Sequence, residues 1–256
     1  MISVVLATYN EEKNLAKCLN SVRDWADEIV VVDGSSIDKT REIAKKYRAL
    51  IVKTTNKLNF HINKQMAIDH AKGDLVLQLD ADEVVDEELR NFILELNKKV
   101  AKTKISAWYL KRKNYFFGRF LKKGGQYPDQ VIRLFKKNRA YLPAKDVHEQ
   151  MVVKGVTKIA DGHLLHYSNP RFAVYWHKFN TYTSFKAHQL EDSKVKINFF
   201  SFFYFVFYKP ILTFFNLYFR HKGFVDGWAG FIFAYFSGFY FLVSYLKYYE
   251  LTLNHD

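Results

Sequence analysis

The sequence contains one cysteine, Cys18, and lacks the glycine-rich fingerprints that identify many nucleotide-binding proteins. A single thiol offers no intrachain disulfide, which fits a reducing cytoplasm. No Walker loop and no Gly-x-Gly-x-x-Gly motif occurs, so a P-loop and a dinucleotide fingerprint are both excluded. Internal repeats and low-complexity linkers are absent as well. Because the first strand candidate starts at residue 2, we expect no signal peptide ahead of it.

Acidic residues are almost missing from residues 98–139, where 14 Lys or Arg accompany a single carboxylate, Asp129. Most of these cations are typical of a solvated surface, but together they create a strong positive field. With a net charge of +13, the chain suits an anionic acceptor, an anionic membrane surface or nucleic acid. We expect no nucleic acid partner, because no recognised binding module accompanies the charge.

The first 80 residues alternate short apolar runs with segments of helical periodicity. Such alternation is typical of α/β proteins, and it predicts a mostly parallel, doubly wound sheet flanked by helices. The expected strands are residues 2–7, 28–33, 50–53 and 75–80, and the expected helices are residues 14–25, a segment ending near 47, and 63–72.

Three of the predicted strands end in polar clusters, at residues 8–11, 33–40 and 80–82. Right-handed crossovers bring these ends to one edge of the sheet, where α/β sheets bind ligands. Asp80 and Asp82 are hard oxygen ligands suited to Mg²⁺ or Mn²⁺, the ions that neutralise a diphosphate. The alternative for these two residues is a strand end followed by the acidic start of a solvated helix. For Asp38 and Thr40 in the second cluster, helix capping is favoured over ligand contact.

These three clusters, taken together, resemble the nucleotide-binding half of family 2 glycosyltransferases. The matching segments are Val5-Leu-Ala-Thr-Tyr-Asn-Glu-Glu, Val31-Val-Asp-Gly-Ser-Ser-Ile-Asp-Lys-Thr and Leu79-Asp-Ala-Asp-Glu. Each motif alone is only moderately specific, whereas three in this order make a strong match. The resemblance implies the GT-A fold, a UDP-sugar donor, a Mn²⁺ or Mg²⁺ cofactor and inversion at the anomeric centre.

The resemblance also implies roles for individual residues. Asp33 is expected to hydrogen-bond the base, while Asp80 and Asp82 hold the ribose, the diphosphate and the metal. Lys64 stands near the place of a family arginine, and it would neutralise phosphate as a point charge rather than as a fork. The nucleoside pocket is expected to be lined by Thr8, Asn10 and Glu11.

Late histidines ligate the metal in some GT-A enzymes, and His166 is placed for that role. His163 is a weaker candidate. The alternative for both is an ordinary core or surface histidine, which is the more frequent outcome.

An inverting transfer needs a general base near the acceptor hydroxyl. The family supplies this carboxylate after a strand that residues 131–135 match, which places Glu149 at the base position with His148 beside it. Asp129, before that strand, is the alternative, and it could instead bind sugar or acceptor hydroxyls. His148-Glu149 and the pattern Pro-Asp-x-x-x-Arg-Leu-Phe are similar to lipopolysaccharide and lipooligosaccharide core β-1,4-glucosyltransferases. The Glu-Asp base pair usual there is absent, which leaves both assignments open.

The carboxyl-terminal quarter is rich in aromatic residues, with 24 of the chain's 45 between residues 199 and 249. Residues 227–246 carry no charge and match the length of a membrane span, whereas we expect Lys209-Pro210 to break the preceding apolar run. A spanning hairpin would place Arg220 and Lys222 on the outer side, against the positive-inside tendency. We therefore favour helices lying in, or dipping shallowly into, the cytoplasmic leaflet. A buried helical pair or an oligomer interface is the alternative.

The sequence thus predicts a glycosyltransferase domain over residues 1–170 and a membrane-associating helical region over 171–256. Within the first, residues 1–100 bind the nucleotide sugar and 101–170 supply the acceptor and base region. The expected reaction moves a sugar, glucose by resemblance, from a UDP-sugar to a lipid-linked saccharide such as lipopolysaccharide core. It would take place at the cytoplasmic face of the inner membrane. The alternatives are a polyprenyl-phosphate glycosyltransferase and a non-catalytic, basic membrane-binding protein.

Overall fold

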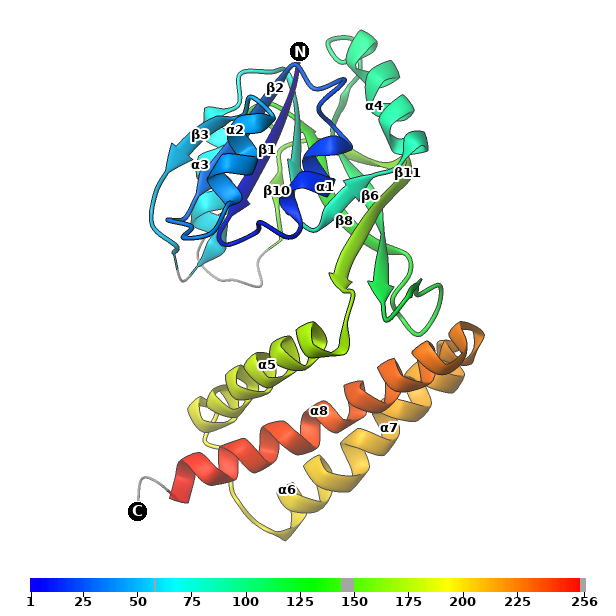
Figure 1. The fold of residues 1–256 in the computed structure, drawn as a ribbon. Coiled ribbons are helices and arrows are strands. Elements are labelled where there is room, and N and C mark those ends of the chain that lie inside the picture. The colour runs from blue at the N-terminus through cyan, green and yellow to red at the C-terminus, as the bar shows by residue number, and fades with distance from the viewer. Residues whose placement is uncertain (58, 144–149, 254–256) are drawn as a thin grey trace. The chain divides into compact units, whose positions relative to one another are not determined.

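The computed structural model describes residues 1–57, 59–143 and 150–253 (Figure 1). The chain forms two compact units. The sheet unit consists of Met1–Arg112 and Asp129–His166. The helical unit consists of Lys113–Pro128 and Tyr167–Asp256, so the short insertion 113–128 belongs with the carboxyl-terminal helices.

Parallel strands and covering helices form the first half of the sheet unit, as the sequence predicts. The strands lie in the order β3-β2-β1-β4, all parallel, and β1 is at the centre of this half. Their bounds are β1 (Ile2–Thr8), β2 (Glu28–Asp33), β3 (Leu50–Lys53) and β4 (Leu75–Leu79). The helices are α1 (Leu15–Asn20), α2 (Thr40–Lys46), α3 (Phe60–His70) and α4 (Glu87–Lys99).

Both faces of this parallel sheet are buried, which explains why its strands read as continuous apolar runs. Val4 and Leu6 of β1 pack into one core with α1 and α4, and Val5 packs into a second core with α3 on the opposite face. Alternate side chains of one strand thus serve two cores. The carboxyl ends of β1, β2 and β4 are held in register between them.

Antiparallel strands complete the sheet in the order β4-β8-β6-β11-β5. The strand expected at 131–135 is confirmed as part of β8, which pairs antiparallel with β4 and places Leu134 opposite Leu77. Glu83 lies in β5 and is fully buried, so it is no part of a solvated helix start. The bounds of these strands are β5 (Glu83–Val85), β6 (Ile105–Phe116), β8 (Asp129–Lys136) and β11 (Val156–Asn169), and β7 (Arg119–Phe120) pairs with β6. β9 (Ala140–Tyr141) and β10 (Val152–Val153) form a separate antiparallel pair.

The helical unit contains α5 (Phe172–Asp192), then one helix from Phe199 to Arg220, and finally α8 (Gly227–Leu253). The second helix consists of α6 (Phe199–Phe203), a π-helical segment Tyr204–Tyr208, α7 (Lys209–Phe215) and a second π-helical segment Asn216–Arg220. A 3₁₀ turn, Gly223–Asp226, leads into α8.

The break expected at Lys209-Pro210 is wrong, because this helix continues through the proline. Proline lacks the N–H that an α-helix uses, and its ring clashes with the carbonyl four residues earlier. The π-helical segment just before Lys209 widens the turn at that point, and such bulges let a helix absorb a local mismatch.

Helix α5 runs alongside α8 in the same direction (Figure 1). Lys247 of α8 fixes the contact, since its ammonium donates to the Asn180 carbonyl at 2.7 Å and to the Thr183 hydroxyl at 2.9 Å. Near the end of both helices, the Tyr248 hydroxyl donates to the Val195 carbonyl at 2.6 Å. The two helices therefore form one packed element over most of their length.

Candidate active site

A pocket of about 290 Å³ opens in the sheet unit beyond the carboxyl ends of β1 and β4. This is the edge at which the sequence predicts ligand binding. Six of the predicted site residues line it, and the complete lining is Ala7, Thr8, Tyr9, Glu11, Asn56, Phe60, Asn63, Lys64, Asp80, Ala81, Asp82 and His166. The structure thus brings residues from four separate segments of the chain to one cavity.

Asp80 is held between two cations. Lys64 on α3 contacts its Oδ1 at 2.5 Å, and Arg133 on β8 pairs with its Oδ2. Burial alone would raise the pKa of the Asp80 carboxyl, but the charges of Arg133 and Lys64 outweigh it and hold that pKa well below its usual range. Burial also lowers the pKa of Lys64 despite the attraction of Asp80. Both oxygens of Asp80 are therefore engaged by side chains of the protein.

Asp82 has different surroundings and lies beside His166. The imidazole Nε2 is 3.5 Å from Oδ2 of Asp82, and both side chains line the pocket. His166 reaches this position because β11 pairs with β5, where His166 lies opposite Glu83. Two octahedral ligands at about 2.1 Å from one ion are about 3 Å apart, so a small divalent cation fits between these groups. A carboxylate oxygen with an imidazole nitrogen is a suitable pair of donors.

Next to the pocket, a chain of partly buried ion pairs extends from Asp80 to Asp129. Arg133 also lies 3.4 Å from Oε1 of Glu83, and Arg112 lies 3.5 Å from the same oxygen. Arg112 then holds Oδ2 of Asp129 through Nε at 2.9 Å and Nη2 at 2.7 Å. With Lys64, three cations oppose three carboxylates, which is how charges withdrawn from water are tolerated.

Arg112, Arg133 and Glu83 are absent from the candidates that the sequence alone suggests. For Arg133 the sequence does contain an indication. It is four residues from the candidate Asp129 on one strand, so the two side chains share a face. Asn63 was also missed, and it lines the pocket one residue before Lys64. Its side-chain amide donates to the Thr55 carbonyl at 3.0 Å, while its buried Oδ1 has no partner among the described residues.

Asp33 and Asn10 lie beside the pocket and are not part of its lining. The carboxylate of Asp33 is fully buried at the end of β2, where Ser36 donates to it from its backbone N–H at 3.0 Å and its hydroxyl at 2.5 Å. Thr8 donates to it from the neighbouring strand at 3.4 Å. The side-chain oxygen of Asn10 accepts from the backbone N–H of Ile37 at 2.9 Å. These contacts tie the loop after β1 to the loop after β2.

His163 belongs to a second cluster, with Asp86 and Glu88, whose ligand atoms lie within 4.8 Å of one another. Asp86 has a structural role there, because its carboxylate caps α4 by accepting from the Leu89 N–H at 2.9 Å. It also accepts from the backbone N–H of His163 at 2.9 Å. None of the three lines the pocket. We therefore place the candidate metal site at Asp82 and His166.

The two remaining predictions concern the catalytic base. Glu149 and its neighbour His148 fall outside the described residues. The alternative base, Asp129, is at the start of β8 in the salt bridge with Arg112 described above, and it is not part of the pocket lining.

Comparisons with known proteins identify the family of the chain. The sequence profile described as "Glycosyl transferase family 2" matches residues 3–150. The chain is 29% identical over 264 residues to the lipopolysaccharide core biosynthesis glycosyltransferase LpsC of Rhizobium meliloti (strain 1021), covering 97% of this chain and 92% of LpsC. It is 28% identical over 263 residues to an uncharacterized glycosyltransferase of Rickettsia typhi, covering 99% of this chain and 88% of that protein.

Two solved structures are also similar to parts of the chain. The TarS structure of S. aureus is 18% identical with a TM-score of 0.45, covering 87% of this chain and 45% of TarS. Glucosyl-3-phosphoglycerate synthase from Mycobacterium tuberculosis, in complex with Mn²⁺, uridine diphosphate and glucosyl-3-phosphoglycerate, is 22% identical with a TM-score of 0.35. That match covers 46% of this chain and 44% of the synthase. Each match covers less than half the length of the solved chain.

Proposed function

The chain belongs to glycosyl transferase family 2, whose profile spans more than half of it, and on this premise we propose a membrane-attached, inverting transferase that uses a UDP-sugar. The observation that carries the proposal is the pocket at the ends of β1 and β4, which gathers Lys64, Asp80, Asp82 and His166. Such a site combines a cation for phosphate with an acidic position for a divalent metal.

In this proposal the donor occupies the pocket, with its nucleoside along Thr8 and Glu11. Asp33 is proposed to recognise the base from the end of β2, with Asn10 fixing the adjoining loop. Each carboxylate oxygen accepts two hydrogen bonds, so Oδ1 of Asp33, which accepts from the Ser36 N–H, retains acceptor capacity, whereas Oδ2 already accepts from the Ser36 and Thr8 hydroxyls. Lys64 is proposed to serve both Asp80 and the donor phosphates.

We assign the metal to Asp82 and His166, with Mn²⁺ or Mg²⁺ as the ion. When bound, it would offset the negative charge that develops on the departing diphosphate. Asp80, held by Lys64 and Arg133, keeps the turn that presents Asp82 in place and is proposed to contact the ribose or the metal. The chain's own contribution is thus to fix the donor and to balance charge around it.

The proposed base is Glu149, with His148 beside it and Asp129 as the alternative. Its task is to take the proton from the acceptor hydroxyl as the oxygen attacks the anomeric carbon. The salt bridge from Arg112 supports the lower rank of Asp129, because the guanidinium occupies Oδ2 of this carboxylate and Asp129 does not line the pocket.

The proposed acceptor is a lipid-linked saccharide such as lipopolysaccharide core, and the proposed sugar is glucose. Support comes from the relative described as a lipopolysaccharide core biosynthesis glycosyltransferase, which the chain matches over nearly its whole length. The basic stretch 98–139 suits the anionic character of such an acceptor.

Membrane attachment is proposed through the helical unit, on the cytoplasmic face. Among the described residues, two helices are long and apolar enough to cross a membrane by length and composition, Phe199–Arg220 and Gly223–Leu253. In the first, no residue of its most apolar stretch is fully buried. A lipid interface would cover this surface, which would otherwise be an aggregation liability.

The direct test is turnover of UDP-glucose by the purified full-length protein with Mn²⁺, with and without a chelator. We expect hydrolysis or transfer that the chelator suppresses, together with thermal stabilisation by UDP and Mn²⁺. A panel of nucleotide sugars in the same stabilisation assay would identify the preferred donor. Absence of both turnover and stabilisation with every nucleotide sugar would reject the proposal.

A further inference from the structure

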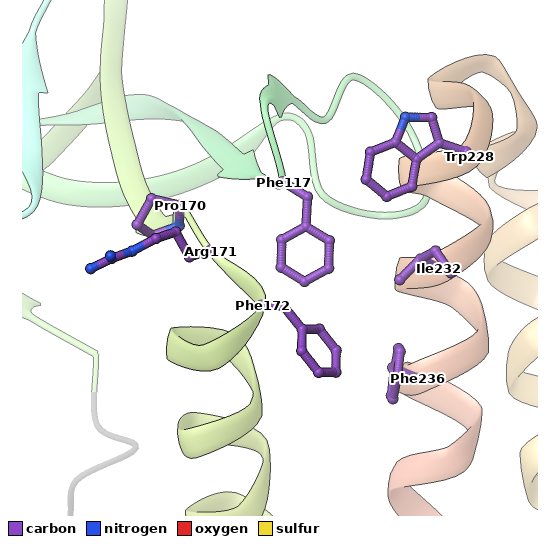
Figure 2. A pocket seen from close by; sticks show the side chains of 7 residues that line it. All are labelled: Phe117, Pro170, Arg171, Phe172, Trp228, Ile232 and Phe236. Carbon is purple, nitrogen blue, oxygen red and sulfur yellow. The ribbon is translucent and has the colours of Figure 1, made fainter.

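The helical unit contains an apolar pocket that the proposed sugar transfer does not use. Its volume is about 480 Å³, within the range of about 300–1,000 Å³ usual for ligand pockets. The guanidinium of Arg171, on the rim, extends away from the aromatic side chains (Figure 2). The walls come from the insertion, the start of α5 and the first turns of α8, as Figure 2 shows for Phe117, Phe172, Trp228, Ile232 and Phe236.

A buried carboxylate next to this pocket fixes a basic loop of the insertion. Asp226 is fully buried, and it accepts hydrogen bonds from the backbone N–H groups of Lys122 at 3.0 Å and Lys123 at 2.8 Å. The guanidinium of Arg119 donates to the Asp226 carbonyl at 3.0 Å. The Asp226 carboxylate binds the backbone of both lysines rather than their side chains. It therefore does not neutralise the charges of the two ammonium groups.

The turn between the two apolar helices adds further cations at the same place. The Gly124 N–H donates to the His221 carbonyl at 2.9 Å, which holds the loop against the turn that contains Arg220 and Lys222. We call these five residues the basic turn, namely Arg119, Lys122, Lys123, Arg220 and Lys222. It joins two segments about a hundred residues apart in the sequence, which is why neither alone indicates a site.

The basic turn and the pocket are adjacent. Arg119 follows Phe117 by two residues, and Asp226, which holds the Arg119 guanidinium, precedes Trp228 by two residues. The rings of Phe117 and Trp228 stack with centroids 6.3 Å apart. A cationic patch therefore lies at the Phe117–Trp228 end of an aromatic pocket.

We propose that this is a binding site for one anionic phospholipid of the bilayer, with an acyl chain in the aromatic pocket and the phosphate against the basic turn. The apolar walls match a hydrocarbon chain, and the five cations match a phosphate in charge. The outward-facing apolar residues of the flanking helices, Phe224 and Phe231 among them, continue the surface that a bilayer would cover. The site lies wholly within the helical unit, so it rests on the proposed membrane attachment and is independent of sugar transfer.

The test uses the full chain in phosphatidylcholine vesicles that contain a small fraction of phosphatidylglycerol with brominated acyl chains. Bromine quenches nearby tryptophan fluorescence, and the signal from the pocket is the difference between the wild type and Trp228→Phe. We expect quenching of Trp228 by brominated phosphatidylglycerol well above that by an equal fraction of brominated phosphatidylcholine. Equal quenching by the two lipids would overturn the proposal.

Two variants separate the parts of the site. Arg119→Gln combined with Lys122→Gln should reduce the preference for phosphatidylglycerol roughly tenfold, because each basic residue near an anionic surface contributes to binding. The matched control, Lys194→Gln with Lys196→Gln, removes the same charge near the carboxyl-terminal end of α8, where Tyr248 binds the intervening Val195. It should leave the preference for phosphatidylglycerol unchanged. That end lies about 30 Å from Trp228, from the rise of a helix of some 20 residues. Equal losses in both double variants would show general charge attraction and reject a built site.

Ile232→Phe fills the pocket without changing charge. It should weaken quenching of Trp228 while vesicle attachment and UDP binding persist, and unchanged quenching would exclude the pocket as the place of the acyl chain. UDP binding, measured in parallel, reports on the sheet unit, so loss of the lipid site and failure of the proposed transfer give different results.

Discussion

At the scale of single residues, Asp80 and Asp82 have separate roles because their neighbours differ. Asp80 is paired through both oxygens, whereas Asp82 shares the pocket with His166. A cation entering at Asp80 would compete with Lys64 and Arg133, which are already in place. At Asp82 the cation would instead meet a second ligand, the imidazole of His166. The geometry therefore favours Asp82 as the residue on which metal-dependent turnover depends.

Asp82→Ala should lower turnover about a hundredfold or more, since a bound cation supplies several kcal/mol of transition-state stabilisation and each 1.4 kcal/mol is tenfold in rate. The measurement is the rate with UDP-sugar across a titration of Mn²⁺. Asp86→Ala is the control, because it removes a carboxylate from the other possible cluster. It should keep metal-dependent turnover and lose about 0.5–2 kcal/mol of stability with the helix cap. The opposite pattern would move the metal to Asp86, Glu88 and His163.

Arg133 is the residue on which the buried charge network depends. Arg133→Met leaves Asp80 and Glu83 with fewer partners, and breaking a buried ion pair costs about 3–5 kcal/mol. We expect a Tm lowered by about 10 °C in thermal unfolding. The Tm of Arg133→Lys should lie between those of the wild type and Arg133→Met. A lysine keeps the charge, but it cannot replace the fork that reaches Gln78, Asp80 and Glu83. Arg23→Met removes an exposed ion pair and should cost at most about 1 kcal/mol, and a similar loss in both Met variants would contradict this assignment.

The base assignment is tested by two amide substitutions. Glu149→Gln should retain UDP binding and lower transfer about a hundred- to ten-thousand-fold, because the amide cannot accept the acceptor's proton. Asp129→Asn should lower transfer much less, but it should reduce Tm because Arg112 loses its closest partner. Transfer rates at saturating donor and melting curves distinguish the two effects. If Asp129→Asn abolished transfer and Glu149→Gln were nearly silent, the roles would be exchanged.

At the scale of helices and strands, the parallel half of the sheet was predictable because its signals are local. Strands such as β1 are buried on both faces and read as apolar runs, and the polar residues at their ends mark the ligand edge. The position of β8 was not predictable in this way. Its antiparallel place beside β4 depends on pairing between residues more than fifty positions apart, and it is this register that delivers Arg133 to Asp80.

The course of the helix through Pro210 was also not predictable, because it depends on residues distant in the sequence. The sequence around Pro210 predicts a break, but the preceding π-helical segment and the packing against Gly238 of α8 carry the helix through. A Cβ at Gly238 would lie 2.5 Å from the Pro210 carbonyl oxygen, so the two helices meet closely there. Local pattern describes neither this contact nor the tie from Asp226 to the insertion.

Gly162 is the point at which β11 contacts α4, and it positions the strand that carries His166. Its φ of +82° is unfavourable for other residues, and a Cβ there would lie 2.1 Å from the Leu89 nitrogen. Gly162→Ala should destabilise the protein by more than the roughly 1–3 kcal/mol of backbone strain alone. Gly118→Ala is matched to it, with φ at +89° and open space around the added methyl group. Thermal unfolding should show the larger loss for Gly162→Ala, and equal losses would mean that the contact with α4 has no role.

At the scale of the molecule, the packing of α5 against α8 bears on how the helical unit meets a membrane. A bilayer crossed by α8 would have to accommodate α5 as well, since Lys247, near the carboxyl-terminal end of α8, binds Asn180 and Thr183 midway along α5. Helix α5 carries Lys178, Lys186, Glu191 and Asp192. Each charge at the bilayer centre costs about 2.5–3.5 kcal/mol or more. These charges support the proposal that the helical unit lies in the plane of the interface.

This arrangement predicts the accessibility of the two ends of the Phe199–Arg220 helix. Cysteines introduced as Lys196→Cys and Lys222→Cys flank it, and the native Cys18 is buried, with its pKa raised by burial and nearby carboxylates, so it should react slowly. A helix in the plane of the cytoplasmic leaflet leaves both positions on one side, so a membrane-impermeant maleimide should label both in inverted vesicles and neither in intact spheroplasts. A spanning helix would expose one of the two from the outside. Labelling of either position in intact spheroplasts would therefore replace the interfacial arrangement with a hairpin that crosses the bilayer.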